Sequence, residues 1–89
     1  MGFVAIKARI ADYDTYKKVY DGMTSVRKEW GCKSERAFRN SSNPSEVMVL
    51  LEWDDMRKCQ EYTMSTDARD AMSRAGVQGT PEITFLNEA

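Results

Sequence analysis

The sequence predicts a single α+β domain, residues 1–89, in which helices cover one face of a four-stranded antiparallel sheet. Three observations lead to this fold class: one segment that is apolar on both faces, two segments with helical periodicity, and turn signals between them. The resulting order is strand, helix, strand, strand, helix, strand. A chain of 89 residues buries only a thin core, so an oligomer would add to its stability.

The segment Glu46–Trp53 is the centre of this prediction because a strand with this sequence is apolar on both faces. Alternation divides its apolar side chains into two sets, which are Val47, Val49, Leu51 and Trp53 on one face and Met48 and Leu50 on the other. Helices can cover one of these faces. We expect a second copy of the chain to cover the other.

A strand at Phe3–Ile10 and one long helix are expected before this segment. The strand is apolar on one face and carries Lys7 and Arg9 on the other. Asp12 or Asp14 can cap the helix. Its apolar stripe consists of Tyr13, Tyr16, Val19, Tyr20, Met23, Val26 and Trp30. Gly31 then provides a left-handed stop.

The strand Cys32–Asn40 has the mixed polarity of a sheet edge, and the turn residues 41–45 join it to Glu46–Trp53 as an antiparallel hairpin. Asp54 is expected to cap the second helical segment. A second capping signal at Ser65 predicts either one interrupted helix or two short ones, up to Gly76.

Residues 79–81, Gly-Thr-Pro, predict an extended entry to a last strand at Glu82–Asn87. The complete order of elements is that of the ferredoxin-like fold, in which right-handed crossovers place both helical segments on one sheet face. The other face is left bare. A bare apolar face of this size marks an interface, so we expect a homodimer that forms through the sheet.

Composition excludes several classes of partner. Thirteen basic and fourteen acidic residues give a net charge of −1 without a basic patch, so neither nucleic acid nor an anionic membrane is expected. No stretch approaches the ~20 apolar residues of a membrane span, and no signal peptide is evident, which favours a cytoplasmic protein. Cys32 and Cys59 lack metal or redox spacing and are expected to be reduced.

The sequence contains no histidine. Its absence excludes Ser-His-Asp and Cys-His nucleophile systems and removes the commonest general base and metal ligand. It also removes the usual proximal ligand of haem. We therefore expect neither a metal site nor a cofactor.

Three segments resemble the dimeric α+β barrel superfamily, most closely its small proteins related to antibiotic biosynthesis monooxygenases: Glu46–Trp53 with the two aspartates that follow it, Ser65–Met72, and Ala75–Val77. The resemblance covers almost the whole chain. It implies a small-molecule pocket between helices and sheet, lined by the aromatic face of the first helix. Because superfamily members include cofactor-free oxygenases, haem-degrading enzymes, isomerases and cyclases, the resemblance does not fix a reaction.

Haem degradation is not expected even so. Haem-degrading members carry an asparagine on the first strand, a tryptophan at the end of the third, and a histidine on the second helix. Trp53 resembles that tryptophan, but the first strand has Lys7 and Arg9 and the second helix has no histidine.

The candidate pocket residues are Tyr16, Tyr20, Arg36, Trp53 and Tyr62. They would surround a small aromatic or polyketide-like compound. The alternative is that the rings simply fill the core and that Arg36 is an exposed edge charge. Two functions follow: a cofactor-free, monooxygenase-like enzyme, or a non-catalytic dimeric ligand-binding or accessory protein. A cavity on the order of several hundred Å³ would favour the enzyme, and a solid core would favour the second.

Overall fold

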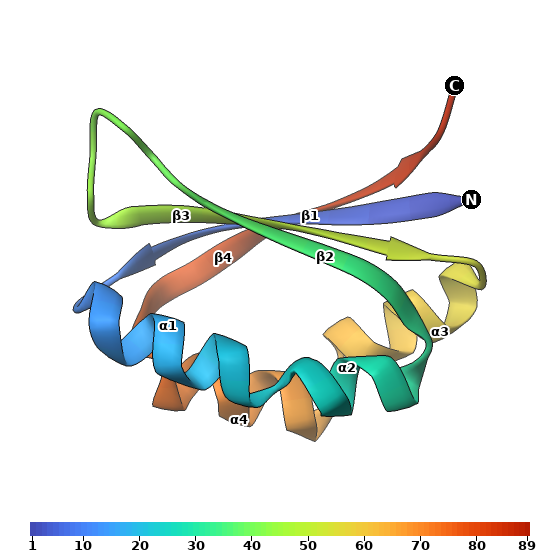
Figure 1. Cartoon of the computed structure of the whole chain (residues 1–89), viewed down its shortest axis with the longest axis horizontal. Coiled ribbons are helices and arrows are strands. Elements are labelled where there is room, and N and C mark those ends of the chain that lie inside the picture. The colour runs from blue at the N-terminus through green and yellow to red at the C-terminus, as the bar shows by residue number, and fades with distance from the viewer.

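The computed structural model describes all 89 residues and contains a four-stranded antiparallel sheet with helices on one face only (Figure 1). The elements in chain order are β1 (Gly2–Ile10), α1 (Tyr13–Gly22), α2 (Thr24–Trp30), β2 (Cys32–Arg39), β3 (Glu46–Trp53), α3 (Met56–Thr63), α4 (Thr66–Arg74) and β4 (Val77–Asn87). The strand order β2-β3-β1-β4 puts β1 and β3 at the centre of the sheet, and β2 is an edge strand as its mixed polarity predicted. None of the helices has the length and apolar content that crossing a membrane would require.

The strand β3 forms the centre of the core. Its helix-facing side chains are at most 7% exposed, and they are Val47, Val49, Leu51 and Trp53. On its other face Met48 is 41% exposed and Leu50 is half-buried, because no helix lies over that side. The predicted two-sided apolar strand is therefore confirmed, but the chain itself covers only one of its sides.

The single helix predicted from Tyr13 to Trp30 is instead two helices. α1 ends at Gly22, and Met23 separates it from α2 with φ −97° and ψ 0°. Gly22 accounts for the break, because glycine is among the weakest helix formers. Both predicted ends are confirmed: Asp12 caps α1, and Gly31 ends α2 with φ +114°.

The second helical segment is divided at Ser65, whose Oγ accepts a hydrogen bond from the Ala68 N–H at 3.1 Å. The prediction of Asp54 as the first cap is wrong by one residue. Asp55 caps α3 by accepting from the N–H two residues further on, at 2.9 Å. A bend at Asp54 still separates the end of β3 from the helix, so its carboxylate turns to Lys33 of β2 at 3.5 Å.

The last strand begins at Val77, five residues before its predicted start at Glu82. Residues 79–81 form a bulge inside the strand, where one residue of β1 lies opposite three of β4, and Gly79 has φ +66°. Pro81 is tolerated because β4 is an edge strand. The turn signal at residues 79–81 therefore marks a bulge within β4 rather than the start of the strand.

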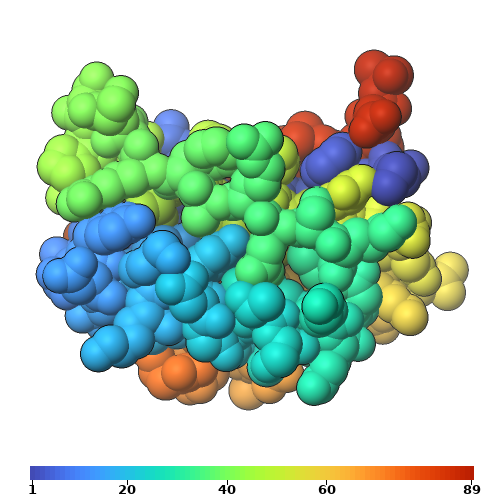
Figure 2. Space-filling model, viewed as in Figure 1, coloured from blue at the N-terminus to red at the C-terminus, as the bar shows by residue number.

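The bare sheet face is the side of the sheet that no helix covers. Figure 2 shows the β2–β3 turn and the C-terminal residues rising at its two ends. The register places apolar side chains from all four strands on this face, among them Phe3, Phe38, Met48, Leu50 and Leu86. Lys7 lies between Glu46 and Glu82, with its Nζ 3.9 Å from a carboxylate oxygen of each, so these ion pairs form within one sheet.

The capping assignment can be tested with neighbouring aspartates. Asp55→Ala removes the acceptor for an otherwise unpaired helix N–H and should lower the free energy of unfolding by about 1 kcal/mol. Asp54→Ala removes only an exposed ion pair and should change it by less than about 0.5 kcal/mol. Urea unfolding followed by circular dichroism measures both. Equal losses in the two variants would contradict the assignment.

Candidate ligand cavity

An apolar cavity of about 80 Å³ lies between the sheet and the helices. Fifteen of its 17 lining residues are hydrophobic, so a ligand there would be held mainly by apolar contacts. Drug-sized pockets are larger, roughly 300–1,000 Å³. The predicted cavity is therefore present, although it is smaller than the size expected for an enzyme of this kind.

The cavity exists because α4 presents small side chains to the sheet. Ala68, Ala71 and Ala75 are all buried and all line it. They recur at three- and four-residue steps and so form one face of the helix. Leucines at these positions would fill the space between α4 and β3.

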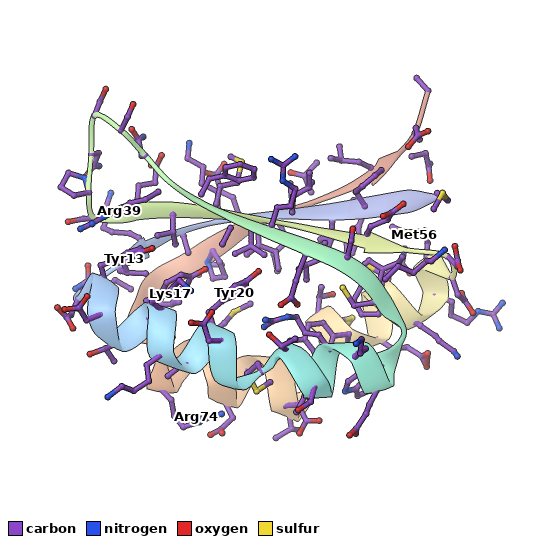
Figure 3. All side chains as sticks on the ribbon, viewed as in Figure 1. Tyr13, Lys17, Tyr20, Arg39, Met56 and Arg74 are labelled. Carbon is purple, nitrogen blue, oxygen red and sulfur yellow. The ribbon has the colours of Figure 1, made fainter.

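Aromatic side chains from α1 and α3 line the cavity. Tyr16 and Tyr20 stack with ring centroids 6.0 Å apart and an angle of 14° between the rings. Tyr20 lies on the side of α1 that faces the sheet (Figure 3). Tyr62 of α3 lines the same space. The tyrosine stripe of α1 and Tyr62 of α3 thus bring three predicted pocket residues together.

The hydroxyl groups of two buried tyrosines, Tyr16 and Tyr62, are the main polar feature of the cavity wall besides Arg27. Tyr16 is 7% exposed and Tyr62 is 5% exposed. The Tyr62 hydroxyl is hydrogen-bonded to Arg27, but neither tyrosine donates its hydroxyl proton to a protein acceptor. Both tyrosines line the cavity, where a ligand oxygen would accept these protons.

Burial sets the protonation of these groups. It raises the pKa of Tyr20 to about 12 and raises the pKa values of Tyr16 and Tyr62. All three remain protonated at neutral pH and act as hydrogen-bond donors. Burial likewise raises the pKa values of the free thiols Cys32 and Cys59, the latter to about 11, so neither is a nucleophile.

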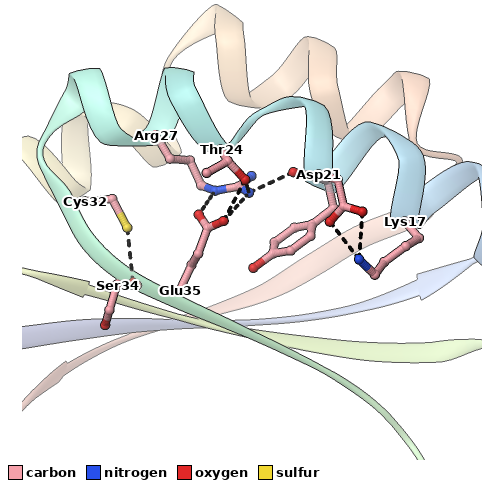
Figure 4. A network of polar contacts seen from close by, with 8 residues as sticks. Lys17, Asp21, Thr24, Arg27, Cys32, Ser34 and Glu35 are labelled. Atoms are coloured by element: carbon pink, nitrogen blue, oxygen red, sulfur yellow. Dashed lines mark hydrogen bonds and ion pairs between the residues drawn. The ribbon is translucent and has the colours of Figure 1, made fainter.

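Arg27 of α2 is the one charged residue that lines the cavity, and the sequence analysis missed it. It is 4% exposed, and it donates from Nε to Glu35 Oε2 at 2.5 Å and from Nη2 to Glu35 Oε1 at 3.1 Å (Figure 4). Nη2 also donates to the Tyr20 carbonyl oxygen at 2.7 Å. The signal was available, because Arg27 follows Met23 by four residues and Tyr20 by seven, on the apolar helix face.

Two predicted pocket residues do not line the cavity. Trp53 lies fully buried in the core beside Tyr62, with ring centroids 5.7 Å apart. Arg36 belongs to the bare sheet face, where it pairs in register with Leu50 and its guanidinium lies 5.2 Å from the Phe38 ring centroid. Grouping Arg36 with the tyrosines was therefore wrong, because the alternation of β2 directs Glu35 to the helices and Arg36 away from them.

A second hollow, larger and polar, lies beside the start of α1. Its lining includes Asp12, Asp14 and Arg39. Arg39 covers the Tyr13 ring at 4.1 Å and donates to the Pro44 carbonyl oxygen at 3.1 Å (Figure 3). Asp12 is occupied by the helix cap, so the charged groups of this hollow are largely engaged with the chain itself.

The Arg27–Glu35 ion pair makes stability depend on pH. Arg27 holds the pKa of Glu35 below its ordinary value, so the pair stabilises the fold at neutral pH, and the stabilisation is lost as the pH falls through the lowered pKa. Between about pH 7 and about pH 3, wild type should lose more free energy of unfolding than Glu35→Gln. Urea unfolding at each pH measures this loss. Asp21→Asn, which breaks an exposed pair with Lys17, is the control and should behave as wild type.

Solved structures share this fold over most of their length. A candidate antibiotic biosynthesis monooxygenase from Caulobacter crescentus CB15 has a TM-score of 0.80 at 18% identity, over 99% of this chain and 89% of that chain. Another from Bordetella bronchiseptica has a TM-score of 0.79 at 11% identity, over 100% and 99%. SnoaB, a cofactor-independent oxygenase from Streptomyces nogalater, has a TM-score of 0.78 at 10% identity, over 99% and 91%. At these identities the likeness is one of fold.

The sequence itself carries the family assignment. Among curated proteins, none matches the chain. Residues 4–74 match the sequence model of the family described as antibiotic biosynthesis monooxygenase. This match covers most of the chain and confirms the resemblance noted in the sequence. The chain therefore belongs to the antibiotic biosynthesis monooxygenase family.

Proposed function

We propose that this protein is a cofactor-free, monooxygenase-like enzyme that binds a small aromatic compound in the cavity between helices and sheet. Membership of the monooxygenase family supports the reaction class. The apolar lining supports the ligand class. A volume of about 80 Å³ lies below the ~150 Å³ of a cavity that accommodates benzene, so a single ring is the upper limit and the fused rings of a polyketide-like compound are too large.

The observation that carries this proposal is that the buried hydroxyls of Tyr16 and Tyr62 line the cavity without a protein acceptor for their protons. Burying a hydroxyl without a hydrogen bond costs roughly 1–3 kcal/mol, and native proteins rarely leave such groups unexplained. A ligand oxygen in the cavity would accept from them. Apolar walls would hold the ring while the hydroxyls fixed its orientation.

The reaction can be written with O₂ as the only oxidant. A phenol and one O₂ give a quinone and one water, so that one oxygen atom enters the ring and the other leaves as water. Without a cofactor, the substrate itself must supply the electrons, which it does more readily once deprotonated. The cavity needs to bind such a substrate away from bulk water.

A specific observation favours the alternative, a non-catalytic ligand-binding or accessory protein. No carboxylate lines the cavity, and its tyrosines all have raised pKa values, so none of these groups is a base at neutral pH. A substrate would have to ionise without a protein base. Oxygen consumption in the presence of a bound phenol separates the two functions.

Ligand binding can be tested by filling the cavity. We expect phenol to raise the melting temperature of wild type, and Ala71→Leu to abolish that rise because a leucine occupies the ligand's space. Tyr62→Phe should weaken binding by about tenfold, the cost of roughly one hydrogen bond. Tyr13→Phe, outside the cavity, should bind as wild type. If Ala71→Leu and wild type are stabilised equally, the ligand binds elsewhere.

We also propose that two chains pair through their bare sheet faces. Exposed Phe38 and Met48 and half-buried Leu50 support this, because a contiguous apolar surface at the centre of a sheet is typical of an interface. The helices lie entirely on the other side (Figure 1). Two buried, reduced thiols in each chain suit a reducing compartment, so a cytoplasmic location is part of the proposal.

The dimer can be tested by placing charge at the centre of that face. Light scattering after size exclusion should give the mass of two chains for wild type and of one chain for Met48→Asp/Leu50→Asp, since unpaired carboxylates are costly to bury. Met64→Asp is the control, because Met64 is 70% exposed at the end of α3, on the helical side. A monomeric wild type would refute the proposal.

A further inference from the structure

The guanidinium of Arg27 has one nitrogen that Glu35 and the backbone leave free. Nε and Nη2 are occupied by Glu35, by the Tyr20 carbonyl oxygen and, at 3.4 Å, by Thr24 Oγ1. The Tyr62 hydroxyl, which is hydrogen-bonded to Arg27, is the protein partner left for Nη1. Arg27 is 4% exposed and lines the cavity, so its guanidinium borders the space that a ligand would occupy.

The hydroxyl of Tyr62 lies beside this guanidinium. Burial raises the pKa of Tyr62, and the nearby positive charge of Arg27 partly counteracts that rise. The Tyr16 pKa is influenced by the same charge. The guanidinium of Arg27 and two tyrosine hydroxyls therefore provide hydrogen-bond donors to a space with no carboxylate. The complementary ligand group is an acceptor, and an anionic one is the best match.

We propose that the cavity holds its ligand as an oxyanion, the phenolate of a single-ring phenol, with the oxygen in contact with the hydroxyl of Tyr62 and the guanidinium of Arg27. This inference rests on the proposed function, because it needs an aromatic ligand in the cavity. It does not need that ligand to be oxidised. The apolar lining strengthens the interaction, since little water screens the charges.

Glu35 is the positioning residue of this site. Its two carboxylate oxygens fix the guanidinium from one side and leave Nη1 on the other (Figure 4). The negative charge of Glu35 also cancels part of the attraction between Arg27 and a bound phenolate. The titratable groups that face Arg27 are Tyr16 and Tyr20 of α1, Cys32 and Glu35 of β2, and Tyr62 of α3. Of these, only Glu35 is charged at neutral pH.

The proposal explains how a cavity without a base could serve an oxygenase. Preferential binding of the phenolate lowers the pKa of the bound phenol, and the proton passes to solvent when the ligand binds. The bound anion then gives up an electron to O₂ more readily than the neutral phenol. Arg27 would be a catalytic residue in this scheme, because it touches the reacting oxygen.

The test uses the full chain with two probes, 4-nitrophenol, whose ionisation is visible by absorbance, and nitrobenzene, which lacks the hydroxyl. A pH titration of saturated protein should give a pKa for bound 4-nitrophenol about one unit below that of the free probe, which is about tenfold preference for the anion. Glu35→Gln should enlarge this shift, because it removes the opposing negative charge. Lys18→Gln, which changes an exposed residue of α1, should leave it unchanged.

Arg27→Gln alone could unfold the chain by leaving Glu35 unpaired, so Arg27→Gln/Glu35→Gln replaces both charges with amides of similar shape. This double variant should bind nitrobenzene as wild type and lose the pKa shift of 4-nitrophenol. If both probes bind wild type and the phenol pKa is unshifted or raised, the oxyanion inference is overturned while the proposed function stands. If neither probe binds, the proposed function fails and this inference fails with it.

Discussion

Burial of one side of β3 is the interaction on which the rest of the structure depends. Trp53, Leu51 and Val47 are at most 2% exposed, and each such side chain contributes about 2–3 kcal/mol when removed from water. Four short helices are too small to be stable alone, and this surface gives them something to pack against. The other side of the same strand carries Met48 and Leu50, and no helix of the chain covers this second apolar surface.

The cavity is a local exception to close packing, and it has a clear cause. Ala68, Ala71 and Ala75 are too small to fill the distance between α4 and β3. Polar atoms then occupy the walls of this gap, where they cost stability unless something binds them. This core is incompletely packed and has the charged Arg27 beside the cavity. Both features lower stability, and such departures from the most stable arrangement are common at binding sites.

The chemistry of the site lies in its side chains rather than in its fold. Solved structures with this fold are 10–18% identical to the chain, and at that identity the likeness is one of topology. Here the cavity contains donors but no base at neutral pH, which limits it to ligands that accept hydrogen bonds or ionise readily. Arg27, which is paired with Glu35, is the only charged side chain that lines this otherwise apolar cavity.

The sequence by itself determined the order of elements, the strand β3 with its two apolar faces, the sheet edges and the tyrosine stripe, because these depend on periodicity and local capping. It also placed the helix break near Ser65. Helical period and strand alternation also carried the signal that Arg27 lies on the apolar face of its helix and that Arg36 points away from the helices. Only the tertiary structure decided that this helix face borders a cavity rather than a filled core. The cavity likewise belongs to the tertiary structure, since its volume is set by the distance between α4 and the sheet, which local sequence patterns do not encode.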